Sequence, residues 1–400
     1  MQRLVALSLI AFAALTLSLA GCNSRGTNVV EPKPEETSAA KVEVQKRLTW
    51  NIPVDLASDA LYMSSKLRFD GNFGLAYFSP SQKTVFYDEY TIEGTRLSSV
   101  KVLTGFADCR GLALGLSFCD KPLIILCNSV DKYLYFVCHD TRSLPGYATA
   151  PGWAIKVLDN FGDVGSGSTW DTIENGCMLL AYVNSTISKI VIRSFGGPSG
   201  PAWVQTIPYD GTPDGNLSFS INRADGEPVV AFHDAKTKSL ICARRKAGAW
   251  TTEVVDKSGD VGYFCKVRTS ITGEILIAYQ DLTDANHPVT KVAHKTAESW
   301  AVETADSAPS GYKLDLVLDA AQHPHILSTD GTAFRYACNN GSAWEAMTIP
   351  CTVGIEGDLN LYVPKTGKPT AFLASGNKIR FMNTLAAWPV DSGSPQSGWR

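Results

Sequence analysis

Two acidic loops of nearly the same sequence are the first candidates for chemistry in this chain. Asp159-Asn-Phe-Gly-Asp-Val-Gly165 recurs as Asp256-Lys-Ser-Gly-Asp-Val-Gly262, with five of seven positions identical. Carboxylates gathered from separate loops are the hard oxygen ligands that Ca²⁺ takes. Asp side chains also cap turns, because they accept hydrogen bonds from the backbone two residues on. We favour turn caps and assign no cofactor, with Ca²⁺ as the alternative.

The histidines and cysteines form no recognisable metal or catalytic motif. His323-Pro-His325 is the only close pair among six histidines, and no third ligand follows at metal spacing, so we predict a turn and no metal site. The sequence contains no Gly-x-Ser-x-Gly elbow and no Walker phosphate loop. Nine cysteines follow Cys22. The cluster between 109 and 138 could hold one disulfide, but spacing alone gives no connectivity.

The overall composition is that of an ordinary globular protein. The chain has 400 residues, of which 44% are hydrophobic and 19% charged. Its 36 Lys and Arg residues and 39 Asp and Glu residues give a net charge of −3. Proteins that bind nucleic acid usually carry an excess of basic residues, which this chain lacks. Thirty-three Gly, 20 Pro and nine Trp indicate many turns and aromatic-rich strands.

Tryptophan spacing reveals an internal repeat. Six tryptophans recur at intervals of 44 to 50 residues: Trp153, Trp203, Trp250, Trp300, Trp344 and Trp388. A second marker is an Ala followed by an aromatic residue at the end of an apolar run. It recurs at 76–77, 181–182, 231–232, 278–279 and 371–372, with degenerate copies at 123–127 and 325–328. Seven copies therefore fit the chain.

One copy shows what the repeated unit contains. Its four apolar or alternating runs are Leu217-Ser-Phe-Ser-Ile221, Pro228-Val-Val-Ala-Phe232, Leu240-Ile-Cys-Ala243 and Trp250-Thr-Thr-Glu-Val-Val255. Short turns separate them, and no helical period is visible. The sequence therefore predicts an all-β fold, a seven-bladed β-propeller of four-stranded antiparallel blades. The recurring tryptophans are expected to pack between blades.

The chain also contains a candidate for closing the ring. Trp50-Asn-Ile-Pro-Val54 is similar to a final strand such as 250–255, yet it precedes the first complete blade. We predict that it forms the outer strand of the seventh blade, beside residues 378–383. The competing segment, Trp388-Pro-Val390, is short, and its Pro removes a ladder donor.

The copies resemble the repeats of secreted bacterial propellers. The shared form is Gly-x-Pro-x-x-Ala-aromatic-x-Asp, which is clearest from Gly226 to Asp234. The resemblance covers residues 48 to 391. It implies an architecture and no particular activity, because propellers support many functions.

In a propeller, outer-to-inner connections and second-to-third turns emerge on the same face. Three loops there depart from the repeat or carry the acidic motif: 159–169, 256–264 and 280–290. Ligands bind more often to loops than to strands. The candidate ligand face comprises Asp163, Trp170, Asp260, Asp281, Asp284 and His287. For Trp170 core packing is the default interpretation, and a place on the ligand face is the alternative.

The N-terminus has the pattern of a secretion signal. Arg3 precedes an apolar run over 4–19, which is short for a membrane span. The run ends in Leu19-Ala20-Gly21-Cys22, which resembles the lipobox of bacterial lipoproteins. The resemblance implies lipidation (palmitate) at Cys22 and anchoring in the cell envelope. Asn23 in place of Asp implies the outer membrane. We expect a signal peptide over 1–21, a tether over 22–46, a propeller over 47–391 and a tail over 392–400.

Two functions from different classes fit these expectations. The first is a lipid-anchored envelope protein for binding or scaffolding, which engages a carbohydrate or a protein through one loop face. The alternative is a carbohydrate-active enzyme, a glycoside hydrolase or polysaccharide lyase, with carboxylates from separate blades. No nucleic acid partner is expected. The sequence favours the first function because no catalytic motif is visible.

Overall fold

A computed structural model describes residues 49–387, apart from 118, 140–147, 173–177, 196–201, 297–298, 340, 342, 350 and 352–357. The signal peptide, Cys22, the tether and the tail lie outside the described residues, as do Cys177 and Trp388. Among the residues described, no helix is long and apolar enough to cross a membrane.

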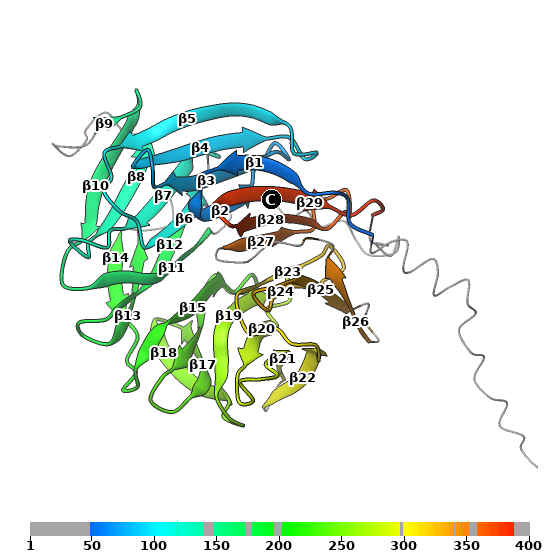
Figure 1. The fold of residues 1–400 in the computed structure, drawn as a ribbon. Helices are drawn as coiled ribbons and strands as arrows, with labels where there is room; N and C mark the ends of the chain where they lie inside the picture. Colours follow the sequence, from blue (N-terminus) through cyan, green and yellow to red (C-terminus); the bar gives the residue numbers. More distant parts are fainter. Residues whose placement is uncertain are drawn as a thin grey trace, which may run out of the picture. The chain divides into compact units, whose positions relative to one another are not determined.

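The chain forms seven antiparallel sheets that are arranged radially (Figure 1). From inner to outer strand, the first blade comprises β2 (Leu61–Leu67), β3 (Phe73–Ser79), β4 (Thr84–Tyr90) and β5 (Arg96–Thr104), and the second comprises β6 (Gly111–Leu116), β7 (Pro122–Cys127), β8 (Leu134–His139) and β10 (Trp153–Asp159). The third blade comprises β11 (Val164–Thr172), β12 (Met178–Asn184), β13 (Lys189–Ser194) and β14 (Trp203–Thr206). The fourth comprises β15 (Pro213–Ile221), β16 (Pro228–Asp234), β17 (Ser239–Lys246) and β18 (Ala249–Asp256).

The remaining three blades have the same order. The fifth blade comprises β19 (Val261–Thr269), β20 (Ile275–Asp281), β21 (Val289–Lys295) and β22 (Trp300–Asp306). The sixth comprises β23 (Leu314–Leu318), β24 (Pro324–Thr329), β25 (Phe334–Asn339) and β26 (Trp344–Ile349). The seventh comprises β27 (Leu359–Tyr362), β28 (Thr370–Ser375), β29 (Lys378–Asn383) and β1 (Val54–Ser58). A short strand, β9 (Ala148–Thr149), extends the first blade beyond β5. The predicted seven-bladed propeller of four-stranded antiparallel blades is confirmed.

Ring closure uses the N-terminal segment, as predicted. The strand β1 pairs antiparallel with β29 and completes the seventh blade. Regular pairing begins at Val54 rather than at Trp50, because Pro53 has no N–H to donate. Trp50 still forms an isolated bridge to Thr384. Asp55 then joins the two chain ends through ion pairs to Lys378 at 2.7 Å and Arg380 at 2.9 Å.

The repeated apolar runs form the second strand of each blade. All residues of β3, β7, β16 and β24 are buried. Burial on both faces follows from the position of each blade between two neighbours, so the runs are continuously apolar instead of alternating. The Ala–aromatic marker therefore records where each blade is packed most tightly.

The recurring tryptophans contact the neighbouring blade from the start of each outer strand. The Trp250 indole N–H donates to Gln205 Oε1 at 3.2 Å, which joins the fourth blade to the third. The Trp300 N–H donates to Glu253 Oε2 at 3.0 Å in the same way. Arg245 lies over the Trp203 ring at 5.0 Å. These contacts confirm packing between blades.

Side chains also join the inner strands around the ring. At four junctions a side chain of one inner strand accepts a backbone N–H of the next. Examples are Asp171 from Ile221 at 2.8 Å, Ser218 from Val267 at 3.0 Å, Asp315 from Leu361 at 2.9 Å and Asn360 from Ser65 at 2.8 Å. Adjacent inner strands share no backbone ladder. These bonds therefore help to fix the angle between blades, and with it the loops that each blade presents.

Candidate functional site

Two sets of loops meet on one face of the propeller, as the sequence predicted. The Asp163 backbone N–H donates to Thr186 Oγ1 at 2.8 Å, and the Asp260 N–H donates to Thr283 Oγ1 at 2.9 Å. Each bond joins an outer-to-inner connection to a second-to-third turn. We call this surface the loop face. It comprises the connections 105–110, 160–163, 207–212, 257–260 and 307–313 and the turns 128–133, 185–188, 235–238, 282–288 and 330–333.

The first aspartate of each repeated acidic loop caps a turn. Asp159 Oδ1 accepts the Phe161 N–H at 2.9 Å, and Asp256 Oδ1 accepts the Ser258 N–H at 2.8 Å. The second oxygen of each carboxylate accepts a tyrosine hydroxyl of the following blade. Those bonds run from Tyr182 to Asp159 at 2.5 Å and from Tyr279 to Asp256 at 2.6 Å. Capping therefore explains why these aspartates recur.

The second aspartate of each loop forms an ion pair with the preceding blade. Asp163 pairs with Arg110 and, at 3.1 Å, with Lys132. The hydrogen bond from Arg110 lowers the pKa of Asp163, although partial burial opposes the shift. Asp260 pairs with Lys238 at 2.7 Å. These carboxylates therefore already hold a cationic side chain, and a ligand would have to displace it to gain a charged contact.

The long loop of the fifth blade carries the most exposed candidates. Asp281 is largely buried and pairs with Lys291 at 2.6 Å. Burial opposes ionisation of Asp281, but hydrogen bonds from Lys291 and Thr283 lower its pKa below the ordinary value. Asp284 and His287 remain 61% and 75% exposed and lie 3.3 Å apart. The pKa of Asp284 is lowered, and the main cause is the hydrogen bond that its carboxylate accepts from the Asn286 backbone N–H.

The structure does not bring Trp170 to the loop face. Trp170 lies near the far end of β11, two residues before the strand ends, so it is close to the opposite face. It is buried between the second and third blades, where its indole N–H donates to Ala113 O at 3.3 Å. Its ring stacks on Phe195 at 5.3 Å. Core packing, the default interpretation of this residue, describes its surroundings.

The sequence reasoning missed a buried cluster beneath the loop face. His233 Nδ1 lies 2.6 Å from Asp214 Oδ2, and Nε2 lies 3.6 Å from Asp260 Oδ1. The Tyr263 ring covers the imidazole at 4.1 Å. His233 is only 1% exposed, so a ligand would meet the half-buried Tyr263 instead. The only sequence signal was that a His occupies the variable position of the Ala-aromatic-x-Asp motif.

Two exposed aromatic rings on the loop face were also missed. Phe161 is 69% exposed in the connection that enters the third blade, and Tyr312 is 55% exposed in the connection that enters the sixth. Val130 and Ile187 in the adjacent turns are exposed as well. An exposed ring on a structured loop is available for stacking. Phe161 lies inside a predicted loop, whereas nothing in the repeat marks Tyr312.

Metal and disulfide chemistry find little support in the described part. No group of three or more His, Cys, Asp or Glu there is arranged to hold a metal ion. His323 lies in a turn, where its backbone N–H donates to Asp319 Oδ1 at 2.8 Å. His325 is fully buried, with Nδ1 at 2.5 Å from the Tyr336 hydroxyl. Cys109, Cys119 and Cys127 of the cluster between 109 and 138 are free thiols, as are Cys242, Cys265, Cys338 and Cys351.

Comparisons with known proteins show the fold alone. No protein-family model and no curated protein matches the sequence. The polysaccharide lyase Uly1 is 9% identical over 82% of this chain and 90% of its own, with a TM-score of 0.50. YCF48 from Cyanidioschyzon merolae is 11% identical over 84% and 98%, also with a TM-score of 0.50. The β-propeller domain of Cps50 (Swd1) from Myceliophteria thermophila is 8% identical over 85% and 100%, again at 0.50.

Proposed function

We propose that this chain is a lipid-anchored protein of the bacterial cell envelope whose propeller binds a carbohydrate on the loop face without cleaving it. The observation that carries the proposal is the exposure of Phe161 and Tyr312 on that face. A sugar ring has an apolar C–H face that stacks on an aromatic ring and hydroxyls that need polar partners. Polar groups such as Asp284 and His287 lie on the same face.

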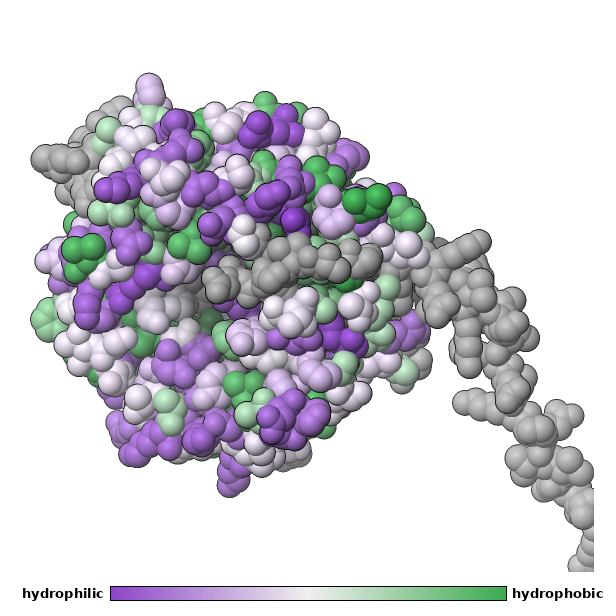
Figure 2. Space-filling model, in the orientation of Figure 1, coloured by the Kyte–Doolittle hydropathy of each residue, from purple (hydrophilic) through white to green (hydrophobic). Residues whose placement is uncertain are grey.

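The character of the surface favours a carbohydrate over a large protein partner. Figure 2 shows hydrophilic and apolar residues intermixed over the face that is drawn, without one large continuous apolar patch. Protein interaction sites more often present a contiguous apolar patch. Exposed rings with polar groups on the same face suit a polysaccharide that contacts the face at separate points.

The electrostatics of the carboxylates favour binding over catalysis. Glycoside hydrolases need two carboxyl groups across the scissile bond, one of them with a raised pKa so that it can donate a proton. On the loop face the pKa values of Asp163, Asp281 and Asp284 are all lowered. The buried His233 has no direct access to a substrate. The polysaccharide lyase among the similar structures shares only the fold with this chain, so it gives no evidence of lyase activity here. Cleavage of a carbohydrate therefore remains the alternative that the experiment below tests.

Lipid anchoring is part of the proposal and rests on the sequence. Cys22 follows Leu19-Ala20-Gly21, so processing would leave it as the first residue of the mature chain. Two or three acyl chains on one residue are enough for stable anchoring. A polar tether over 22–46 would hold the propeller near the membrane. Outer-membrane sorting follows from Asn23 by the same resemblance.

The direct test is an array of envelope polysaccharides probed with the full chain purified in detergent. We expect retention of at least one polysaccharide with no change in its length or reducing ends. Release of shortened or unsaturated products would identify the enzyme alternative instead. Retention of envelope proteins but of no glycan would contradict the carbohydrate proposal.

A further inference from the structure

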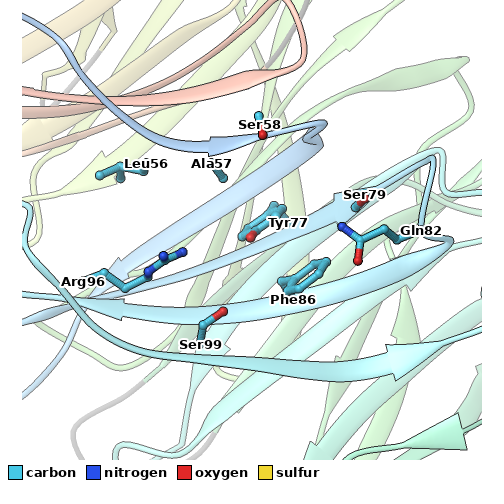
Figure 3. Close-up of a pocket in the computed structure, with 9 residues that line it drawn as sticks. All are labelled: Leu56, Ala57, Ser58, Tyr77, Ser79, Gln82, Phe86, Arg96 and Ser99. Carbon is cyan, nitrogen blue, oxygen red and sulfur yellow. The ribbon is translucent and has the colours of Figure 1, made fainter.

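A cavity of about 350 Å³ lies at the seam where the ring closes. One wall is the N-terminal strand β1, which contributes Leu56, Ala57 and Ser58. The other walls come from the first blade. They are formed by Tyr77 and Ser79 on β3, Gln82 in the turn before β4, Phe86 on β4, and Arg96 and Ser99 on β5. In Figure 3, Arg96 and Gln82 extend toward the cavity from opposite ends, with Tyr77 and Phe86 between them. The Gln82 end of the cavity reaches the turn between β3 and β4, on the same side as the loop face, whereas Arg96 lies at the start of β5, at the opposite end.

Polar side chains of this seam cavity surround the aromatic rings of Tyr77 and Phe86. Arg96 is 54% exposed and carries five N–H donors. Ser58 adds a hydroxyl and Gln82 an amide, whereas the Ser79 and Ser99 hydroxyls donate to Asp59 and Asp88 and offer a ligand only their acceptor oxygens. The Tyr77 and Phe86 rings stack in parallel, 5.1 Å apart and tilted by 7°. Sites for small molecules span about 300–1,000 Å³, so this volume suits a ligand of one or two sugar rings.

The charge around the seam cavity favours an anion. The carboxylate that faces Arg96 is that of Asp88, at 3.8 Å. Asp88 is fully buried and accepts hydrogen bonds from Ser99 at 2.5 Å and Tyr90 at 3.0 Å. Burial raises the pKa of Asp88, although these hydrogen bonds and the charge of Arg96 oppose the shift.

A second cation lies beside the cavity. Lys101 Nζ lies 5.7 Å from the centre of the Phe86 ring and donates to Gln82 Oε1 at 3.2 Å. The other nearby carboxylate, Asp59, accepts the hydroxyls of Ser79 and Ser81. The cavity mouth therefore presents two cations, while both carboxylates are held by hydrogen bonds.

We propose that the seam cavity binds a small sugar that carries a carboxylate, such as a single uronic acid unit. Arg96 would pair with the ligand carboxylate, because its planar fork matches two carboxylate oxygens. The serine hydroxyls and Gln82 would bind the ring hydroxyls. This site shares none of the rings Phe161 and Tyr312 and does not depend on the function proposed for them.

The position of the site has a thermodynamic consequence. Its walls belong to β1 and to the first blade, which meet only when the ring is closed. A ligand that binds only the closed ring stabilises the folded state by mass action. The unfolding temperature should therefore rise with ligand concentration.

The test is a thermal-unfolding titration of the full chain with D-glucuronate, D-galacturonate, D-glucose and sodium acetate at equal ionic strength. We expect the Tm to rise with at least one uronate and not with glucose or acetate. Arg96→Gln should weaken the apparent affinity about tenfold or more, because a charged hydrogen-bond donor is lost. The matched control is Arg244→Gln, which removes an arginine of the fourth blade that pairs with Asp225, and it should keep the response.

Three outcomes would overturn the proposal. An equal shift with acetate would show anion binding without recognition of a sugar. An equal shift with glucose would remove the role of the carboxylate, and an unchanged response in Arg96→Gln would place the ligand elsewhere. Phe161→Ser on the loop face should leave the uronate response intact, and Arg96→Gln should leave polysaccharide retention intact. The two proposals can therefore fail separately.

Discussion

The Asp315 carboxylate accepts the Leu361 backbone N–H at 2.9 Å and so joins the inner strand of the sixth blade to that of the seventh. The same side chain caps the Leu316 N–H and pairs with Arg268 of the fifth blade at 3.4 Å. One largely buried carboxylate therefore connects three consecutive blades. The blades are held together by side chains at the centre as well as by their apolar faces.

Asp315→Ala should destabilise the propeller. The substitution leaves the Leu361 and Leu316 N–H groups and the Arg268 guanidinium without this acceptor. We expect a loss of roughly 2–3 kcal/mol in the free energy of unfolding. Urea unfolding of the variant, compared with Asp315→Asn as a control that keeps an acceptor oxygen, measures the loss. Equal stability of Asp315→Ala and the parent would contradict this role.

Removal of residues 49–58 should open the ring. The deletion takes away β1 and leaves the β29 edge unpaired beside apolar side chains such as Ile379 and Phe381. An unpaired edge of this kind invites aggregation. We expect an aggregated or poorly folded product in size-exclusion chromatography. Asp55→Asn serves as the mild control, since an exposed ion pair contributes at most about 1 kcal/mol. A monodisperse deletion variant with the parent Tm would show that β1 is dispensable.

Asp163 should contribute to acid sensitivity. Its pKa is lowered from the ordinary 3.8, chiefly by the hydrogen bond from Arg110. A carboxylate with a depressed folded-state pKa stabilises the protein above its unfolded-state pKa and loses that contribution as the pH falls through the folded-state value. Asp163→Asn should therefore lower stability by about 1 kcal/mol at neutral pH and flatten the decline below pH 4. The Tm measured from pH 7 to pH 2 tests this. Parallel curves for the two proteins would contradict it.

Cys22→Ser should release the protein from the membrane. The thiol is the group that takes the diacylglycerol in the lipobox resemblance, and serine cannot replace it. We expect the parent to incorporate a labelled fatty acid and sediment with membranes, while the variant stays unlabelled and soluble. Membrane retention of the variant, together with an unlabelled parent, would remove the lipoprotein assignment.

The blades could be predicted from the sequence because every blade packs between two neighbours and so needs a similar pattern of apolar residues. Trp250 and Trp300 mark outer strands, and the Ala231-Phe232 pair marks a second strand buried on both sides. Ring closure by the N-terminus could also be predicted, since Trp50 begins a strand-like segment that the first blade does not use. The exact start of β1 differed because Pro53 interrupts the ladder.

The candidate site was less predictable, because it depends on contacts between residues far apart in the sequence. The Asp214–His233–Asp260 cluster joins two blades, and although the repeated acidic loop marks Asp260, nothing in the sequence places His233 beside it. Trp170 broke the repeat and so resembled a ligand residue, yet it fills space against Gly115 of the preceding blade. Departure from a repeat can reflect local packing as readily as binding.

The central claim is that exposed rings on the loop face hold a carbohydrate, and the most direct measurement is calorimetric titration of the polysaccharide retained in the array. The parent, Phe161→Ser, Tyr312→Ser and the matched control Phe69→Ser should be compared. Phe69 is 63% exposed but lies in the turn between β2 and β3, on the opposite face. We predict that at least one loop-face variant binds roughly tenfold more weakly, because burial of a large apolar side chain is worth about 1.5–3 kcal/mol when it is complete, while Phe69→Ser binds like the parent. Parent-like affinity in both loop-face variants, with loss of binding in Phe69→Ser, would contradict the account.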